Sequence, residues 1–216
     1  FSFLFLFVIM PLVYQQNINE SAGLGVWHIT EDESFFLHKV SLLTPVSHAH
    51  KRLQHLAGRY LLKELFPQFP TEHILIADSR KPYLADELYH FSLSHCGDYA
   101  AAIISRSQRV GIDIELPQKK VEALSVKFLS STEAALIQLL PANPIQNLTA
   151  AWSIKEALFK WYGHGALDFK KHMHILKVSY TQDFFTAKCA ILKGEKTELT
   201  VTGTIIEDNL LTWVVQ

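Results

Sequence analysis

Apolar residues recur every three or four positions in several stretches of the chain, which is the spacing of an amphipathic helix. Thr30 can cap the first of these stretches, and Ser131 or Thr132 can cap the third. Pro67 and Gly163 follow the second and the fourth and would end them. The pattern therefore predicts four helices, over residues 31–40, 46–66, 131–140 and 149–162.

Short apolar or alternating runs predict strands before, between and after these helices. In the first half they cover residues 24–29, 74–76, 91–93 and 110–116. In the second half they cover residues 173–180, 184–192, 197–206 and 210–215. Helices followed by antiparallel hairpins indicate an α+β fold. Because this order repeats loosely, we expect two similar halves, residues 10–116 and 117–216, joined near residues 116–120.

The first thirteen residues are apolar except for Ser2. A membrane-spanning helix needs about 20 apolar residues, so this stretch is too short to span a bilayer. It also lacks the basic start and the cleavage site of a secretory signal. We favour the interpretation that residues 1–9 are an extension upstream of a true start at Met10. An anchoring segment and a buried strand are the alternatives.

The composition favours a folded, soluble protein and excludes disorder, because 49% of the residues are hydrophobic and the net charge is -1. With 20 basic and 21 acidic residues, the chain lacks the basic excess of a general nucleic-acid binder. Cys96 and Cys189 lie far apart and form no CxxC pair. This argues against a disulfide scaffold and a cysteine zinc site, and it favours a reducing, cytoplasmic location.

Asp113 and Glu115 lie two positions apart in a predicted strand. Residues at this spacing point to the same face, so the two carboxylates would project together. Two like charges on one face are unfavourable unless a cation lies between them, and a hard divalent cation prefers such oxygen ligands. The alternative is a solvated edge strand with two surface acids.

Glu156 and Lys160 lie four positions apart and share a face of the predicted helix over residues 149–162. The rest of this helix is largely apolar, so Glu156 and the lysines, Lys155 included, would be costly there without a task. A third carboxylate for a cation and a lysine for a phosphate is the functional interpretation. A surface ion pair is the alternative.

Other polar residues have the chemistry for binding phosphate. Ser94 and His95 end a predicted strand and can donate hydrogen bonds to a phosphate. A Ser/His nucleophile pair is a weaker interpretation, because the chain has no GxSxG elbow there. Arg52 and Arg59 lie two helical turns apart and suit bidentate phosphate contact. The histidine pairs 48/50 and 172/174 lack nearby acid or cysteine ligands at zinc-binding spacing.

Two of these segments resemble the paired motifs of the 4'-phosphopantetheinyl transferase superfamily, (V/I)-G-(V/I)-D and (F/W)-(S/C/T)-x-K-E-(A/S)-x-x-K. They are Val110-Gly111-Ile112-Asp113-Ile114-Glu115 and Trp152-Ser153-Ile154-Lys155-Glu156-Ala157-Leu158-Phe159-Lys160. Three further segments are similar to the family's G-K-P turn, its F-N-L-S-H segment and the acidic stretch between the main motifs: Arg80-Lys81-Pro82, Phe91-Ser92-Leu93-Ser94-His95, and Phe128-Leu129 with Glu133. Arg80 stands in place of Gly and Ser92 in place of Asn. The length matches the longer, two-repeat branch named for the surfactin-synthetase activator.

The resemblance implies two halves related by a pseudo-two-fold axis, with coenzyme A in the cleft between them. It implies Mg²⁺, with Mn²⁺ as an alternative ion, on Asp113, Glu115 and Glu156. It also implies that Lys160 contacts the pyrophosphate and that Lys81 and Pro82 lie against the adenine. The contacts to the 3'-phosphate would come from Ser94, His95 and Arg52, with Arg59 as a weaker candidate.

The implied activity is transfer of the 4'-phosphopantetheine arm of coenzyme A to a serine of an apo carrier protein, as a holo-carrier-protein synthase. The serine proton would go to Glu156, Glu133 or a water on the metal, and Lys155 or Lys160 would steady the leaving phosphate. The expected partners are coenzyme A and an acyl, peptidyl or polyketide carrier, with no nucleic acid and no membrane, and the expected state is a monomer. A non-catalytic relative that binds coenzyme A or a carrier protein on the same fold is the alternative.

Overall fold

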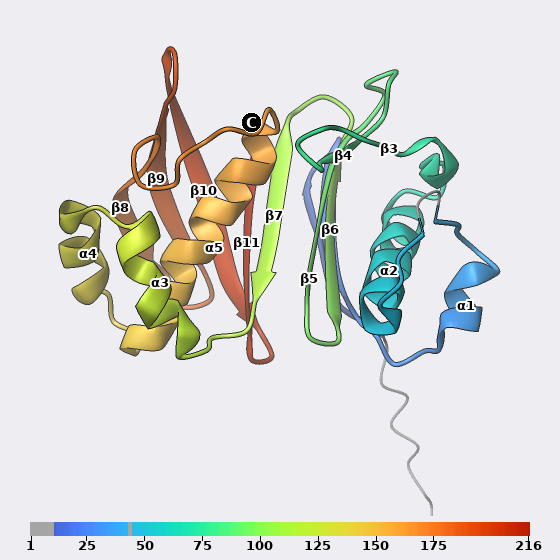
Figure 1. The fold of residues 1–216 in the computed structure, drawn as a ribbon, viewed down its shortest axis with the longest axis horizontal. Coiled ribbons are helices and arrows are strands. Elements are labelled where there is room, and N and C mark those ends of the chain that lie inside the picture. The colour runs from blue at the N-terminus through green and yellow to red at the C-terminus, as the bar shows by residue number, and fades with distance from the viewer. Residues whose placement is uncertain (1–10, 43–44) are drawn as a thin grey trace, which may run out of the picture.

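The computed structural model describes residues 11–42 and 45–216, and its strands form two antiparallel sheets that stand side by side (Figure 1). The first sheet has the order β1 (Leu12–Asn19), β2 (Ala22–His28), β6 (Tyr99–Ser105), β5 (His90–Cys96). The second has the order β7 (Val110–Glu115), β11 (Asn209–Val215), β10 (Lys196–Ile206), β9 (Phe185–Leu192), β8 (Met173–Tyr180). A small third sheet pairs β3 (Leu75–Ile76) with β4 (Pro82–Tyr83).

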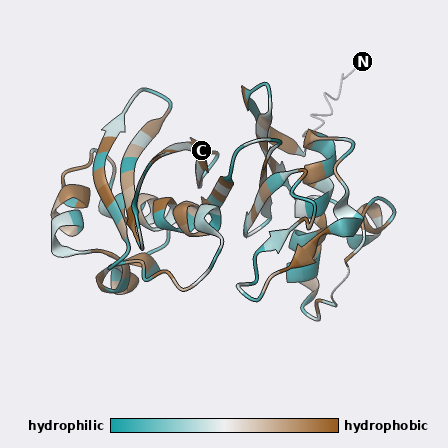
Figure 2. Ribbon diagram, turned by 90° about the horizontal axis from the view of Figure 1, so that it is seen from above, coloured by the Kyte–Doolittle hydropathy of each residue, from teal (hydrophilic) through white to brown (hydrophobic). Residues whose placement is uncertain are grey.

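One long helix packs on each large sheet: α2 lies on β6 and β2, and α5 lies on β7 and β11. Seen from above, the two sheets with their helices form two bodies side by side (Figure 2). The helices are α1 (Glu33–Leu37), α2 (Ala49–Leu65), the short 3-10 helix η1 (Thr71–His73), α3 (Lys120–Phe128), α4 (Ser131–Gln138) and α5 (Pro144–Tyr162). Within the described residues, none of them combines the length and the apolar composition needed to cross a membrane.

The mixed fold with antiparallel strands is as predicted, and β8 to β11 agree with the predicted runs to within one residue at each end. Several helix starts are wrong. Asp32, not Thr30, caps α1, and Ser130 forms a capping box with Glu133 at α4. The helix predicted over residues 149–162 begins earlier, at Pro144, because a proline at the first helical position loses no hydrogen bond.

The elements that were not predicted include β1, β6 and α3. The expected extension, residues 1–9, lies outside the described residues.

A central hydrophobic cluster joins the two bodies. Each body has a core of its own between helix and sheet. The central cluster instead takes residues from both sheets: Leu24, Val26, Ala101 and Ile103 from the first, and Val110, Ile112, Ile114, Leu211 and Trp213 from the second. All nine are at most 4% exposed, so the two bodies share one dry interface.

The strands β5 and β7 meet where the two sheets adjoin, through side chains rather than backbone pairing. The amides of Ile112 and Ile114 donate to the hydroxyls of Ser92 and Ser94, each at 3.3 Å. The amide of Leu116 likewise donates to the Cys96 thiol at 3.2 Å. This seam fixes β7 against β5. Because β7 pairs with β11, it belongs to the second sheet, and the boundary between the sheets lies between β6 and β7. The expected boundary between the two halves of the chain instead lies after β7, at residue 116.

Candidate active site

Asp113 occupies the middle of β7 beside the seam and is only 3% exposed. Its Oδ1 accepts hydrogen bonds from the Ser94 hydroxyl at 2.9 Å and from the Lys160 ammonium at 2.7 Å. Lys160 also donates to the Ser94 hydroxyl at 2.8 Å, which closes a triangle of three side chains. The other carboxylate oxygen, Oδ2, is buried and has no hydrogen-bond partner within the described residues. A buried, unpartnered carboxylate oxygen is costly unless a cation or a donor reaches it.

Glu115 and Glu156 lie close enough to Asp113 to feel its charge. Burial, and then repulsion from Asp113, raises the pKa of the Glu156 carboxyl to about 7, although Lys160 opposes the shift. The same two causes raise the pKa of Glu115, whose Oε1 accepts a hydrogen bond from the Trp152 indole at 3.0 Å. The three predicted acids therefore lie near one another, and their negative charges repel.

The fit of these acids to a divalent cation rests on their chemistry. Carboxylate oxygens are the ligands that Mg²⁺ prefers, and the unpartnered Oδ2 of Asp113 is one such ligand. Within the described residues, however, no three His, Cys, Asp or Glu side chains lie close enough to hold a metal together. The acids therefore fit a cation in kind and in charge but do not form a closed set of ligands.

Basic side chains lie along one face of α2. Lys51, His55 and Arg59 follow one another at four-residue intervals, and the His55 ring lies 5.6 Å from that of His95. Burial, then His55 and Lys160, lowers the pKa of His95 to about 4, although part of its surface is exposed. Burial also lowers the pKa of Arg59, which is 8% exposed. These neighbours repel one another, so an anion would relieve the strain between them.

Sequence reasoning missed Lys51 and His55. The four-residue spacing back from Arg59 was the available signal. The arginine that was preferred, Arg52, instead forms a two-pronged ion pair with Glu33 of α1, with nitrogen–oxygen distances of 2.7 and 2.8 Å. Its guanidinium also donates to the Val46 carbonyl at 2.8 Å. Arg52 therefore joins α2 to α1, and its predicted phosphate contact stays a prediction.

The turn that carries Lys81 and Pro82 lies beside α5. A cavity of about 200 Å³, here called the inner cavity, is lined by this turn together with Glu156, Phe159 and Lys160 of α5. Lys81 passes so close to Gly163 that a Cβ there would lie 2.6 Å from Nζ. The structure thus brings the predicted turn next to two of the predicted catalytic residues.

Glu133 and Lys155 are both buried in the structure, and their predicted catalytic roles stay predictions. They form an ion pair of 2.7 Å in the core of the second body, where they are 2% and 0% exposed. The Lys155 ammonium also donates to two carbonyls, and the Glu133 carboxylate accepts from the Ile175 and Ser130 amides. Burial raises the pKa of Glu133, but these hydrogen bonds outweigh it and hold the pKa below its ordinary value. The pair stabilises the fold around α3, α4 and β8.

Comparison with known proteins connects this site to one family. The family model described as 4'-phosphopantetheinyl transferase superfamily matches residues 109–198, which include Asp113, Glu115, Glu156 and Lys160. Enterobactin synthase component D of Salmonella austin is 32% identical over 142 residues, 62% of this chain and 60% of that protein. The 4'-phosphopantetheinyl transferase AcpT of Salmonella typhimurium (strain LT2) is 32% identical over 132 residues, 58% of this chain and 67% of that protein. The AcpT protein of Escherichia coli (strain K12) is 30% identical over 120 residues, 54% of this chain and 60% of that protein.

The chain spans about 60% of the length of the enterobactin synthase relative. The family motifs, the matching family model and the coverage of the AcpT relative agree with one another. The chain therefore belongs to the 4'-phosphopantetheinyl transferase superfamily.

Proposed function

We propose that this protein transfers the 4'-phosphopantetheine arm of coenzyme A to a serine of an apo carrier protein and releases 3',5'-ADP. The observation that carries the proposal is the Asp113–Lys160–Ser94 triangle, with two further acids and the basic residues His55 and His95 near it. Such an arrangement suits a substrate with several phosphates. The AcpT relatives, which are named as 4'-phosphopantetheinyl transferases, support the same reaction class.

The cations provide the binding energy for the phosphates. Lys51, His55 and Arg59 on α2, with His95 at the end of β5, form a site for the 3'-phosphate. The Arg59 fork can donate two parallel hydrogen bonds to phosphate oxygens, whereas a lysine acts as a point charge. Lys160 lies near His95 and the acids and would contact the pyrophosphate. Pro82, beside Lys81 in the inner cavity, offers a rigid surface for the adenine ring.

We further propose that Mg²⁺ binds at Asp113, Glu115 and Glu156, with Mn²⁺ as a substitute. When bound, the ion would neutralise charge on the pyrophosphate as the leaving group departs. The unpartnered Oδ2 of Asp113 and the repulsion among the three acids support this assignment.

In the reaction the carrier serine Oγ forms a bond to the β-phosphorus of coenzyme A, and the bond from that phosphorus to the oxygen of 3',5'-ADP breaks. Negative charge grows on that leaving oxygen, and Lys160 is positioned to balance it. The serine proton must pass to a base. Of the two acids that the sequence offers for this role, Glu156 lines the inner cavity and Glu133 is buried elsewhere. Glu156 is therefore the side chain that we assign to the proton.

The proposed partner is a carrier protein of the acyl, peptidyl or polyketide type. Exposed lysines lie on α3, just before it, and in the segment before β8: Lys119, Lys120, Lys127, Lys170 and Lys171. They offer a basic surface to an acidic carrier helix. We place the chain in the longer, two-repeat branch, with halves 10–116 and 117–216 related by a pseudo-two-fold axis, and we propose that it acts as a cytoplasmic monomer.

The test is a transfer assay with coenzyme A, Mg²⁺ and a panel of apo carriers, read by mass spectrometry. A carrier should gain the mass of one phosphopantetheine arm. Glu156→Gln should reduce transfer at least about hundredfold, the usual contribution of a positioned acid or base. The matched control, Glu122→Gln, changes an exposed acid on α3 and should transfer at the parent rate.

Failure to modify any carrier, together with failure to bind coenzyme A, would overturn the proposal. Binding of coenzyme A without transfer to any carrier would instead identify a non-catalytic relative on the same fold.

A further inference from the structure

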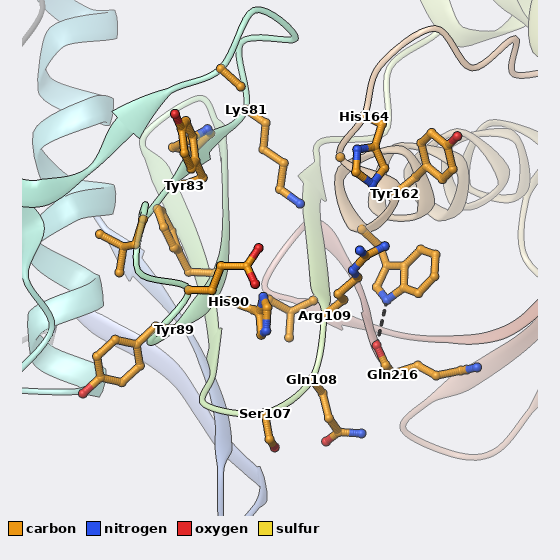
Figure 3. Close-up of a pocket in the computed structure, with 18 residues that line it drawn as sticks. Lys81, Tyr83, Tyr89, His90, Ser107, Gln108, Arg109, Tyr162, His164 and Gln216 are labelled. Carbon is orange, nitrogen blue, oxygen red and sulfur yellow. Dashed lines mark hydrogen bonds between the residues drawn. The ribbon is translucent and has the colours of Figure 1, made fainter.

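A second and larger cavity of about 540 Å³ lies beyond the Lys81–Pro82 turn. It is here called the outer cavity. It is enclosed by β4, the start of β5, the loop from β6 to β7, and the end of α5 with the residues after it (Figure 3). The catalytic acids and the cations of α2 do not line it. Its walls come from both bodies of the molecule.

Basic side chains converge on the outer cavity. Lys81, Arg109 and His164 face the same central space, and His90 lies below them in Figure 3. Within residues 11–42 and 45–216, neither Lys81 nor Arg109 has an ion-pair partner. Glu87 is the one acidic side chain among the lining residues, against the two cationic side chains of Lys81 and Arg109. Glu87 and Arg109 are both exposed, so solvent screens both of these charges. The outer cavity therefore has an excess of positive charge.

The position of Lys81 shows that this charge is poorly compensated. Burial, and then the charge of Arg109, lowers the pKa of Lys81 to about 8. The lysine side chain runs past Gly163, where an added Cβ would lie 2.6 Å from Nζ and 3.0 Å from Cδ. A cation held in such a place without an acid partner gains from any anion that reaches it.

Aromatic rings line the same space. Tyr83 stands on one side, and Tyr162 of α5 stands on the other (Figure 3). Trp161 also lines the cavity, whereas the Tyr89 ring packs against Phe66 and Phe69 in the core of the first body. The Arg109 guanidinium lies 6.0 Å from the centre of the Trp161 ring, within cation–π range. Rings on two facing walls suit a planar ligand, and the guanidinium fork suits a phosphate.

We propose that the outer cavity binds a small phosphate monoester attached to a planar ring. The phosphate would lie between Arg109 and Lys81, with N–H groups of His90 and His164 as further donors, and the ring would lie among the aromatic walls. This inference does not depend on the proposed transferase activity, because Arg109, His90 and His164 have no part in it. Lys81 lines both cavities, so a ligand in the outer cavity would contact a residue of the inner one.

The test is isothermal titration of the full chain with phenyl phosphate, which carries both the ring and the phosphate. It should bind one equivalent with a Kd below about 1 mM. Phenol has only the ring and inorganic phosphate has only the phosphate. Each should therefore bind at least about tenfold more weakly than phenyl phosphate. Saturating coenzyme A should leave one equivalent of phenyl phosphate bound, because the inner cavity is then occupied and the outer one is free.

Two arginines on the same loop give a matched pair of variants. Both are exposed, but Arg109 lines the outer cavity and Arg106 does not. Arg109→Ala should weaken phenyl phosphate binding about tenfold or more, and Arg106→Ala should change it less than about twofold. Arg109→Lys, which keeps the charge but loses the fork, should fall between them.

Absence of binding, or equal effects of the two alanine variants, would overturn the proposal. Loss of binding in Arg59→Ala with no effect of Arg109→Ala would also overturn it, because phenyl phosphate would then occupy the inner cleft. Circular dichroism of each variant confirms that the fold is retained.

Discussion

Arg80 adopts a backbone conformation that residues with a side chain rarely take. Its φ is 65°, in the left-handed region, at the position where the related family motif has glycine. An L-residue there costs about 1–2 kcal/mol, and glycine avoids this cost. Arg80→Gly should therefore raise the free energy of unfolding by about 0.5–1 kcal/mol, measured by urea denaturation.

Arg106→Gly is the control for this prediction. Arg106 is also an exposed arginine in a loop, but its φ is not positive. Here glycine relieves no strain and adds freedom only to the unfolded chain, so stability should fall by about 0.5–1 kcal/mol. Two variants that shift in the same direction would contradict the strain at Arg80.

The buried Glu133–Lys155 pair should be sensitive to the loss of one partner. Glu133→Gln removes the acid but leaves the Lys155 ammonium in the core, so it should lower the unfolding free energy by about 3–5 kcal/mol. Glu122→Gln, at an exposed acid nearby, should stay within about 0.5 kcal/mol of the parent. Similar losses of unfolding free energy in both variants would mean that the buried ion pair contributes no more to stability than an exposed acid does.

The same pair predicts a dependence on acid pH. The pKa of Glu133 is lower in the folded state, so its contribution to stability is complete above the unfolded value of about 4.3. It is lost as the pH falls through the folded pKa. The difference in unfolding free energy between the parent and Glu133→Gln should therefore shrink below about pH 4, and urea titrations from pH 6 to pH 3 would measure it. A constant difference over this range would contradict the lowered pKa.

Sequence reasoning at single residues identified side chains better than it identified their surroundings. Asp113 was chosen because it shares a strand face with Glu115, and its carboxylate accepts a hydrogen bond from Lys160. Glu156 and Lys160 were chosen because acids and lysines are costly in an apolar helix, and both line the inner cavity. The same argument selected Lys155, which meets its cost by pairing with Glu133 in a core. The spacing of apolar residues indicates that a polar side chain points away from solvent. It does not distinguish a side chain in a hydrophobic core from one at a ligand-binding site.

At the level of elements, Gly111 determines how closely β7 approaches α5. A Cβ at this position would lie 2.1 Å from the Ala157 carbonyl oxygen and 2.7 Å from the Trp161 amide nitrogen. Both are backbone atoms and cannot rotate away. This contact sets the distance between the strand that carries Asp113 and the helix that carries Glu156 and Lys160. The glycine of the first motif therefore allows the residues of the two motifs to lie close together.

Gly111→Ala should force the strand and the helix apart. We expect a loss of at least about 2 kcal/mol in unfolding free energy, because neither backbone can yield without strain. The control is Gly58→Ala on α2, where the added Cβ meets only the Leu93 side chain at 3.5 Å. Alanine is the better helix former, so this variant should gain about 0.5–1 kcal/mol. Urea denaturation of the two variants should give opposite signs.

The elements that the sequence failed to predict have weak patterns. Only Val121 and Phe128 are buried in α3, so apolar residues do not recur there at a clear helical spacing. Along β1 the burial alternates, but the residues from Tyr14 to Asn19 are mostly polar, so the sequence shows no apolar alternation. The inner strand β6 is buried along most of its length, and its continuous run of small and apolar residues shows no alternation either. The strands β8 to β11 were found because turn residues separate them clearly.

At the scale of the whole molecule, the active cleft exists only because the central cluster holds the two bodies together. The acids and Lys160 belong to the second body, whereas Ser94, His95 and the cations of α2 belong to the first. Weakening the central cluster should therefore affect ligand binding more than an equal loss within one core. Two fully buried leucines of the second sheet provide the comparison: Leu211 lies in the central cluster and Leu199 in the second body's own core.

Leu211→Ala and Leu199→Ala should each lower the unfolding free energy by about 2–5 kcal/mol. The variants should differ in hydrogen exchange measured by mass spectrometry. With Leu211→Ala, exchange should rise on both sides of the interface, in β6 as well as β11, because the cavity loosens contacts between the sheets. With Leu199→Ala, it should rise in β9 and β10 and leave β6 protected. Matching exchange patterns would mean that the two bodies open as one unit, and that the cleft depends on overall stability rather than on the central cluster.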